Sequence, residues 1–194
     1  MVKQFQSLPN ILTFIRLGLI PLFVILLIEP TDSMRYAAAT VFLVAALTDY
    51  LDGLVARRLG AVSDFGKLLD PLADKILVMA ALVMLVAQRG ELTGRPWVPG
   101  WLVVLLMTRE IWITGLRAVA AKAGHVIAAS NPGKIKSGLQ MTAIILLLVH
   151  EPGILIGEYK LTLGFIGLQL LLISVVVSYW SAVEYTKEIL FQKN

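Results

Sequence analysis

Apolar residues gather in six long stretches, separated by short segments rich in Gly, Pro and charged residues. The stretches run over 11–28, 36–54, 68–88, 98–121, 137–149 and 161–185. A helix that crosses a membrane needs about 20 apolar residues, and all but the fifth stretch come close to that length. The fifth reaches it if its polar beginning, from Gly133, is helical too. The pattern therefore predicts an all-α integral membrane protein with six transmembrane helices.

The composition excludes a soluble globular domain, because 58% of the 194 residues are hydrophobic and only 15% are charged. Six spans leave little of the chain for a separate soluble domain, so residues 1–194 are expected to form a single transmembrane domain. The chain has no cysteine. Disulfides, thiolate metal sites and cysteine nucleophiles are therefore excluded.

The positions of the basic residues predict the orientation of these helices. In the six-span arrangement, ten Lys and Arg residues fall on one side, and the acidic connections fall on the other. The ten are Lys3, Arg57, Arg58, Lys67, Arg117, Lys122, Lys134, Lys136, Lys187 and Lys193. Cytoplasmic connections retain basic residues, so both termini are predicted to lie in the cytoplasm. The net charge of +4 suits anionic headgroups or phosphorylated substrates and does not indicate nucleic acid.

Five of the six aspartates fall within one segment, 48–75. Asp49 and Asp52 are three residues apart, which puts them on one face of the second predicted helix. Asp70 and Asp74 are four apart and share a face of the third. A short loop joins the two helices, so the helices run antiparallel and four carboxylates are expected to converge. Asp64, just before the third helix, is interpreted as an N-terminal partner of the helix dipole.

Four carboxylates at one site need compensation by protons or by metal, because like charges repel and burial is costly. Oxygen ligands without nearby His or Cys favour Mg²⁺ or Mn²⁺, with Ca²⁺ as an alternative. Four carboxylates suffice for two ions, an arrangement suited to phosphoryl chemistry. One carboxylate could then take the proton of an attacking hydroxyl.

A second polar segment, 108–140, concentrates basic residues. Arg109 lies inside an apolar stretch and needs a partner, for which the adjacent Glu110 is the candidate. Further along lie Arg117, Lys134, Lys136 and Gln140. Arg and Lys together suit a phosphomonoester better than a neutral alcohol. The alternative interpretation is a cytoplasmic loop whose basic residues serve only topology, and the same alternative applies to Arg57.

The aspartate segment resembles the CDP-alcohol phosphatidyltransferases, since it matches the pattern DxxDGxxARx8GxxxDxxxD at every motif position. The resemblance implies transfer of a phosphatidyl group from a CDP-linked lipid to an alcohol, with release of CMP and dependence on divalent metal. By match, Asp49, Asp52, Asp70 and Asp74 would hold the metal, and Asp74 would be the catalytic base. The CDP site would comprise Asp49, Asp52, Gly53, Ala56, Arg57 and Gly66. The resemblance also implies a homodimer.

Two other segments resemble the bacterial phosphatidylglycerophosphate synthases within that family. They are "LPNILTFIR" (8–16) and "GKIKSGLQ" (133–140), the latter with Ser137 where Thr is common. The resemblance implies that sn-glycerol 3-phosphate attacks CDP-diacylglycerol at a site facing the cytoplasm. The acceptor phosphate would be held by Arg109, Arg117, Lys134, Lys136 and Gln140.

Three alternatives stay open at this point. The acceptor could be inositol phosphate, serine or another lipid, although the basic segment disfavours serine. A magnesium transporter could use intramembrane carboxylates, but the aspartates lie near one side, with no polar route to the other. A non-catalytic lipid-binding protein would have no use for the aspartate array.

Overall fold

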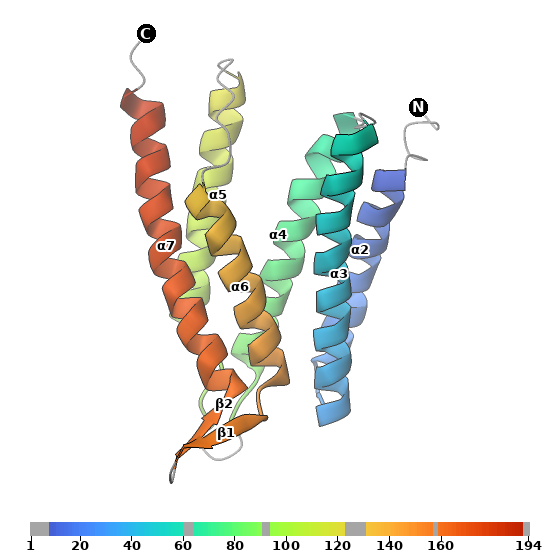
Figure 1. The fold of residues 1–194 in the computed structure, drawn as a ribbon, viewed down its shortest axis with the longest axis vertical. Coiled ribbons are helices and arrows are strands. Elements are labelled where there is room, and N and C mark those ends of the chain that lie inside the picture. The colour runs from blue at the N-terminus through green and yellow to red at the C-terminus, as the bar shows by residue number, and fades with distance from the viewer. Residues whose placement is uncertain (1–7, 60–63, 91–93, 123–130, 157–158, 192–194) are drawn as a thin grey trace. The chain divides into compact units, whose positions relative to one another are not determined.

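Each of the six apolar stretches is largely helical in the computed structural model, which describes residues 8–59, 64–90, 94–122, 131–156 and 159–191 (Figure 1). The helices are α2 (Leu8–Leu26), α3 (Asp32–Leu59), α4 (Asp64–Ala87), α5 (Gly100–Lys122), α6 (Asn131–Val149) and α7 (Leu163–Phe191). Helix α6 begins at Asn131, so the polar start of the fifth stretch is helical. With this start included, the fifth helix reaches 19 residues, close to the length that a membrane span needs. The predicted helical fold is thus confirmed for these residues.

The connection before α7 is a β-hairpin, which the sequence did not predict. Strand β1 (Gly153–Ile156) pairs antiparallel with β2 (Tyr159–Thr162), and Gly153 lies opposite Thr162. A Cβ at Gly153 would collide with the backbone of Leu161, so this position needs glycine. Thr162 then caps α7, since its Oγ1 accepts a hydrogen bond from the Phe165 amide at 3.2 Å. The expected helix start at 161 was therefore two residues too early.

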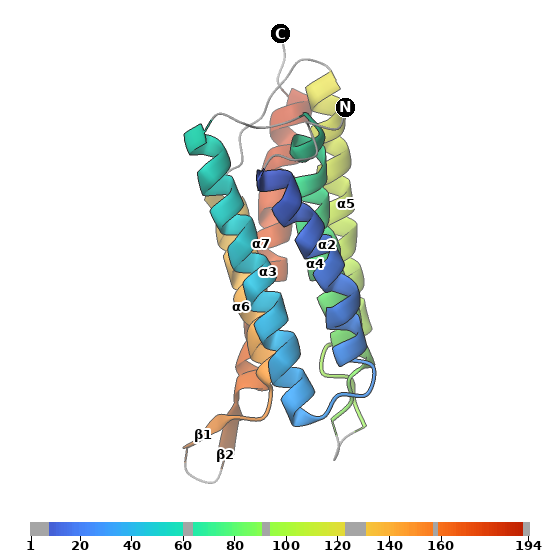
Figure 2. The ribbon, with the colours of Figure 1, turned by 90° about the vertical axis from the view of Figure 1, so that its right-hand side faces the viewer.

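The chain divides into two units, Met1–Leu85 and Val86–Asn194. In the first, α2 packs against α3 (Figure 2). The rings of Phe23 and Phe42 are fully buried, with centroids 6.1 Å apart and planes tilted by 47°. Ala38 and Ala45 are buried on the same face of α3 as Phe42 and allow the helices to approach closely.

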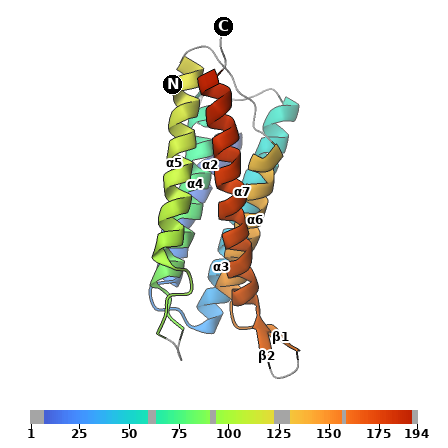
Figure 3. The ribbon, with the colours of Figure 1, turned by 90° about the vertical axis from the view of Figure 1, so that its left-hand side faces the viewer.

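In the second unit, α5 and α6 both pack against α7 (Figure 3). Helices α5 and α7 run parallel, because their contacts advance together from Leu105–Tyr179 to Trp112–Thr186. Helix α6 runs the opposite way and connects to α7 through the hairpin. The carboxyl ends of α5 and α7 and the amino end of α6 thus lie at the same end of this unit.

Within the described residues, one helical segment is long and apolar enough to cross a membrane, namely Leu163–Lys187. Shorter apolar segments occur at Thr13–Leu26, Lys75–Ala87 and Ile135–Val149. Helix α5 is long enough, but Arg109, Glu110 and Arg117 interrupt its apolar run. These three charged residues belong to the basic segment, 108–140.

Candidate active site

The aspartate motif lies on two consecutive helices. Its members are Asp49, Asp52, Gly53, Ala56 and Arg57 on α3 and Gly66, Asp70 and Asp74 on α4. Both helices are regular over these positions, so the intervals of three and four residues correspond to helical faces, as the sequence predicted. The side chains of all eight lie outside the part of the chain that the structure describes.

The connection between the two motif helices is short. Helix α3 ends at Leu59 and α4 begins at Asp64, and residues 60–63 between them lie outside the described ranges. Short connections favour antiparallel neighbours, which agrees with convergence of the two aspartate pairs. The convergence itself stays a prediction, because the side chains concerned lie outside the described residues. Asp64 is itself helical, in the first turn of α4 rather than in the preceding loop. Its side chain lies outside the described residues, so the interaction of its carboxylate with the helix dipole stays a prediction.

The donor set on α3 and α4 is chemically suited to a hard divalent cation. It consists of four carboxylates, and no His or Cys occurs in the segment. Among the side chains that the structure describes, no group of three or more His, Cys, Asp or Glu residues could hold a metal. The four motif aspartates are outside that set, so the expected Mg²⁺ or Mn²⁺ site and its two ions stay a prediction.

Three charged residues of the basic segment form a buried cluster, defined by Arg109, Glu110 and Lys136. Arg109 Nη1 donates a hydrogen bond to Glu110 Oε1 at 2.9 Å, and Lys136 Nζ donates to the same oxygen. Arg109 Nε also donates to the backbone carbonyl of Ser178 on α7, at 2.9 Å. The side chains of Arg109 and Lys136 are each only 7% exposed. The predicted pairing of Arg109 with Glu110 is therefore confirmed.

This cluster joins all three helices of the second unit. Arg109 and Glu110 come from α5, Lys136 comes from α6, and the Ser178 carbonyl belongs to α7. Buried charges persist only when they are paired and hydrogen-bonded, and each of these three is. Two cations share one anion, so the cluster keeps a formal charge of +1. Gln140 is buried one turn beyond Lys136 on α6, and the side chain of Lys134 lies outside the described residues.

Arg117 lies two turns beyond Arg109 on α5 and is exposed. Its Cζ atom is 5.2 Å from the centroid of the Tyr185 ring, a cation–π distance. The Tyr185 ring is buried against Ile113 and Ala182 and so provides a fixed support. Tyr185 could not be assigned a specific role from the sequence, because a tyrosine near the end of an apolar helix is equally typical of a membrane interface.

Arg16 on α2 is a buried residue to which the sequence assigned no role. It is 1% exposed and lies in the same unit as the aspartate motif. Its position within the first apolar stretch could have indicated a role, because an arginine within a membrane span is energetically costly and such residues are usually functional.

Comparison with known proteins agrees with these features. A family model described as CDP-alcohol phosphatidyltransferase matches residues 6–180. The CDP-diacylglycerol–glycerol-3-phosphate 3-phosphatidyltransferase of Bacillus subtilis (strain 168) is 43% identical over 157 residues, covering 75% of this chain and 78% of the relative. The Pseudomonas fluorescens protein of the same name is 35% identical over 192 residues, covering 94% and 89%.

A third relative has a different name. It is the cardiolipin synthase (CMP-forming) of Oryza sativa subsp. japonica, 34% identical over 190 residues, which cover 94% of this chain and 57% of the relative. The family match covers most of the chain and includes both motif helices. This protein therefore belongs to the CDP-alcohol phosphatidyltransferase family.

Proposed function

We propose that this protein transfers the phosphatidyl group of CDP-diacylglycerol to sn-glycerol 3-phosphate, giving phosphatidylglycerophosphate and CMP in phospholipid biosynthesis. The observation that carries the proposal is the match to relatives named for this reaction, one of which covers 94% of the chain. The complete aspartate motif on α3 and α4 supports the chemistry. The basic residues of α5 and α6 support a phosphorylated acceptor.

The reaction is a displacement at the β-phosphorus of CDP-diacylglycerol. The Asp74 carboxylate accepts the proton of the primary hydroxyl of glycerol 3-phosphate as its oxygen forms a bond to phosphorus. The bond from phosphorus to the bridging oxygen breaks, and CMP leaves with that oxygen. Two Mg²⁺ or Mn²⁺ ions held by Asp49, Asp52, Asp70 and Asp74 would neutralise the charge that develops on the phosphates.

The nucleotide is held on the motif helices. Asp49, Asp52, Gly53, Ala56, Arg57 and Gly66 line the CDP site in this proposal. Glycine and alanine have little or no side chain, so a ligand can come close to the helix backbone. Arg57 supplies a charge for the nucleotide phosphates.

The acceptor phosphate is held by Arg109, Arg117, Lys134, Lys136 and Gln140. Glu110 fixes Arg109 and Lys136, and the Tyr185 ring supports Arg117. Cationic groups that are already in place lose little conformational entropy when an anion binds. The cluster keeps an excess positive charge, which suits the dianionic phosphate of the acceptor.

The same proposal places the protein in the cytoplasmic membrane as a homodimer, with six spans, both termini in the cytoplasm and the active site on that side. In its support, the carboxyl end of α5 and the amino end of α6 carry Arg117, Lys122 and Lys136 at one end of the second unit. Large apolar side chains are exposed on the described helices, including Ile111 at 63% and Val176 at 68%. Such surface fits contact with lipid or with a partner subunit.

A second candidate acceptor follows from the rice relative, which is named a cardiolipin synthase. Phosphatidylglycerol, a lipid with free hydroxyls, is the acceptor that would give cardiolipin. The buried basic cluster favours glycerol 3-phosphate instead, because the phosphomonoester of glycerol 3-phosphate has more negative charge than the phosphodiester of phosphatidylglycerol. Inositol phosphate has a phosphomonoester as well and stays a competitor.

The test is CMP release by the purified protein in detergent with CDP-diacylglycerol and Mg²⁺. The acceptors compared are glycerol 3-phosphate, inositol 1-phosphate, phosphatidylglycerol and serine, each with and without EDTA. We expect release only with glycerol 3-phosphate and none with EDTA. Release with a different acceptor alone would keep the family chemistry and overturn the acceptor assignment. Release that persists in EDTA would overturn the metal assignment.

A further inference from the structure

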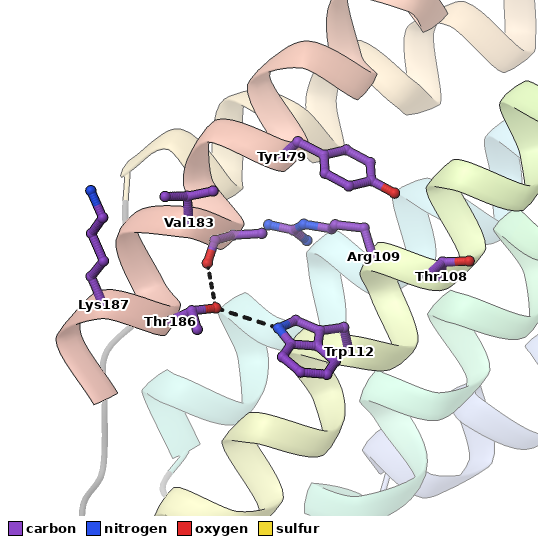
Figure 4. A pocket seen from close by; sticks show the side chains of 8 residues that line it. Thr108, Arg109, Trp112, Tyr179, Val183, Thr186 and Lys187 are labelled. Carbon is purple, nitrogen blue, oxygen red and sulfur yellow. Dashed lines mark hydrogen bonds between the residues drawn. The ribbon is translucent and has the colours of Figure 1, made fainter. Parts of the chain in front are cut away.

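A pocket of about 390 Å³ lies between α5 and α7, within the second unit (Figure 4). Trp112, Tyr179, Ala182 and Val183 form most of its apolar wall. Its volume is within the usual range for small-molecule pockets. The wall presents mainly apolar surface, because Arg109, which also lines it, directs its guanidinium to Ser178 and Glu110. The site therefore suits an aliphatic ligand.

The two ends of this pocket differ in polarity. Lys187 lies at one end, beyond Val183 and Thr186 (Figure 4). At that same end, Trp112 Nε1 donates a hydrogen bond to Thr186 Oγ1 at 3.4 Å. Thr186 Oγ1 in turn donates to the Ala182 carbonyl at 2.7 Å. The Trp112 indole N–H and the Thr186 hydroxyl are therefore held in place at the end of the pocket where Lys187 lies.

The position of Lys187 along α7 indicates the depth of the pocket in a bilayer. Lys187 is the last residue of the segment that is long and apolar enough to span, Leu163–Lys187. It therefore belongs at the level of the headgroups, where Lys and Trp commonly anchor helices. Tyr179 is eight residues deeper, or about 12 Å along the helix. The pocket thus extends from the headgroup level into the hydrocarbon.

We propose that this pocket binds one acyl chain of an anionic glycerophospholipid, with the headgroup phosphate at Lys187 and the chain along Val183, Ala182 and Tyr179. An aliphatic wall below a single cation at the interface matches the two parts of such a lipid. A neutral phospholipid would bind less tightly, because it lacks the net charge that Lys187 attracts. One lysine near an anionic surface corresponds to roughly a fivefold preference.

The experiment is fluorescence quenching by brominated lipid in nanodiscs. Two full-length variants each retain one of the four tryptophans, either Trp112 in the pocket or Trp180, and have Phe at the other three positions. Trp180 lies on α7, is 68% exposed and does not line the pocket, so it reports the surrounding lipid. Brominated phosphatidylglycerol is added at a low mole fraction to phosphatidylcholine. Brominated phosphatidylcholine serves as the neutral comparison.

We expect Trp112 to be quenched by the anionic lipid roughly fivefold beyond its bulk fraction, while Trp180 follows the bulk fraction. Lys187→Gln should remove the preference. Val183→Phe, at a half-exposed position that tolerates bulk, should reduce quenching of Trp112 and leave that of Trp180 unchanged.

Equal quenching of both tryptophans, or a preference that survives Lys187→Gln, would overturn the proposal. Absence of Trp112 quenching by either brominated lipid would also overturn it, because the pocket would then be covered by protein rather than occupied by lipid. The measurement needs no turnover, so its result is independent of the proposed reaction.

Discussion

Replacing Asp74 with asparagine is expected to lower turnover by at least about 10²-fold, the usual contribution of a positioned general base. The amide has nearly the same size as the carboxylate but cannot accept the proton of the acceptor hydroxyl. CDP-diacylglycerol binding should largely persist, because the variant keeps every residue assigned to the nucleotide and the other three metal-binding aspartates. The measurement is CMP release at saturating substrates, alongside retention of labelled CDP-diacylglycerol by the detergent-solubilised protein.

Asp64→Asn provides the matched control for this variant. Asp64 belongs to the same aspartate-rich segment and the same helix, but it lies in the first turn of α4 and outside the motif. Its replacement should cost only the small stabilisation that an acidic residue gives a helix start, about 0.3–1 kcal/mol. Turnover in Asp74→Asn comparable to that in Asp64→Asn would remove Asp74 from the mechanism.

Replacing Glu110 with glutamine is expected to lower the free energy of unfolding by about 3–5 kcal/mol, because it leaves Arg109 and Lys136 buried without an anion. Lys136→Met alone should also be destabilising. The double variant Glu110→Gln/Lys136→Met should lose less stability than the sum of the two single losses, because it removes one of the two cations that Glu110→Gln leaves without an anion. Reversible unfolding in mixed micelles, followed by circular dichroism, measures all three variants.

Glu184→Gln is the control for this second prediction. Glu184 is an exposed glutamate on α7 that accepts a hydrogen bond from Trp180 Nε1 at 2.8 Å. It has no part in the buried cluster, so its replacement should change stability by less than about 1 kcal/mol. If Glu110→Gln proved as stable as Glu184→Gln, the cluster would not be what joins α5, α6 and α7.

Much of the fold could be predicted from the length of the apolar stretches, because a run of about 20 apolar residues is typical of a membrane-spanning helix. The hairpin escaped because its strands are only four residues long, too short for a period-two pattern to stand out beside an apolar helix. Its determinants are tertiary. The backbone of Leu161 opposite Gly153 and the cap by Thr162 become visible only once the two strands pair.

The candidate site was predictable to different extents in its two parts. The aspartate motif depends on spacing along helices, so the sequence alone located it, and the structure confirms that α3 and α4 are helical there. The pairing of Arg109 with Glu110 followed from adjacency and the cost of an unpaired charge. The partner of Lys136 and the ring beneath Arg117 did not, because Glu110 and Tyr185 come from other helices.

The most direct test of the proposed reaction is transfer of labelled glycerol 3-phosphate into lipid. Purified protein is incubated with [¹⁴C]glycerol 3-phosphate, CDP-diacylglycerol and Mg²⁺ or Mn²⁺, and the organic phase is counted and resolved by chromatography. We predict label in phosphatidylglycerophosphate, in proportion to the CMP released, and none without the CDP-lipid or after EDTA. CMP release with no label in the organic phase would contradict the assignment of glycerol 3-phosphate as the acceptor.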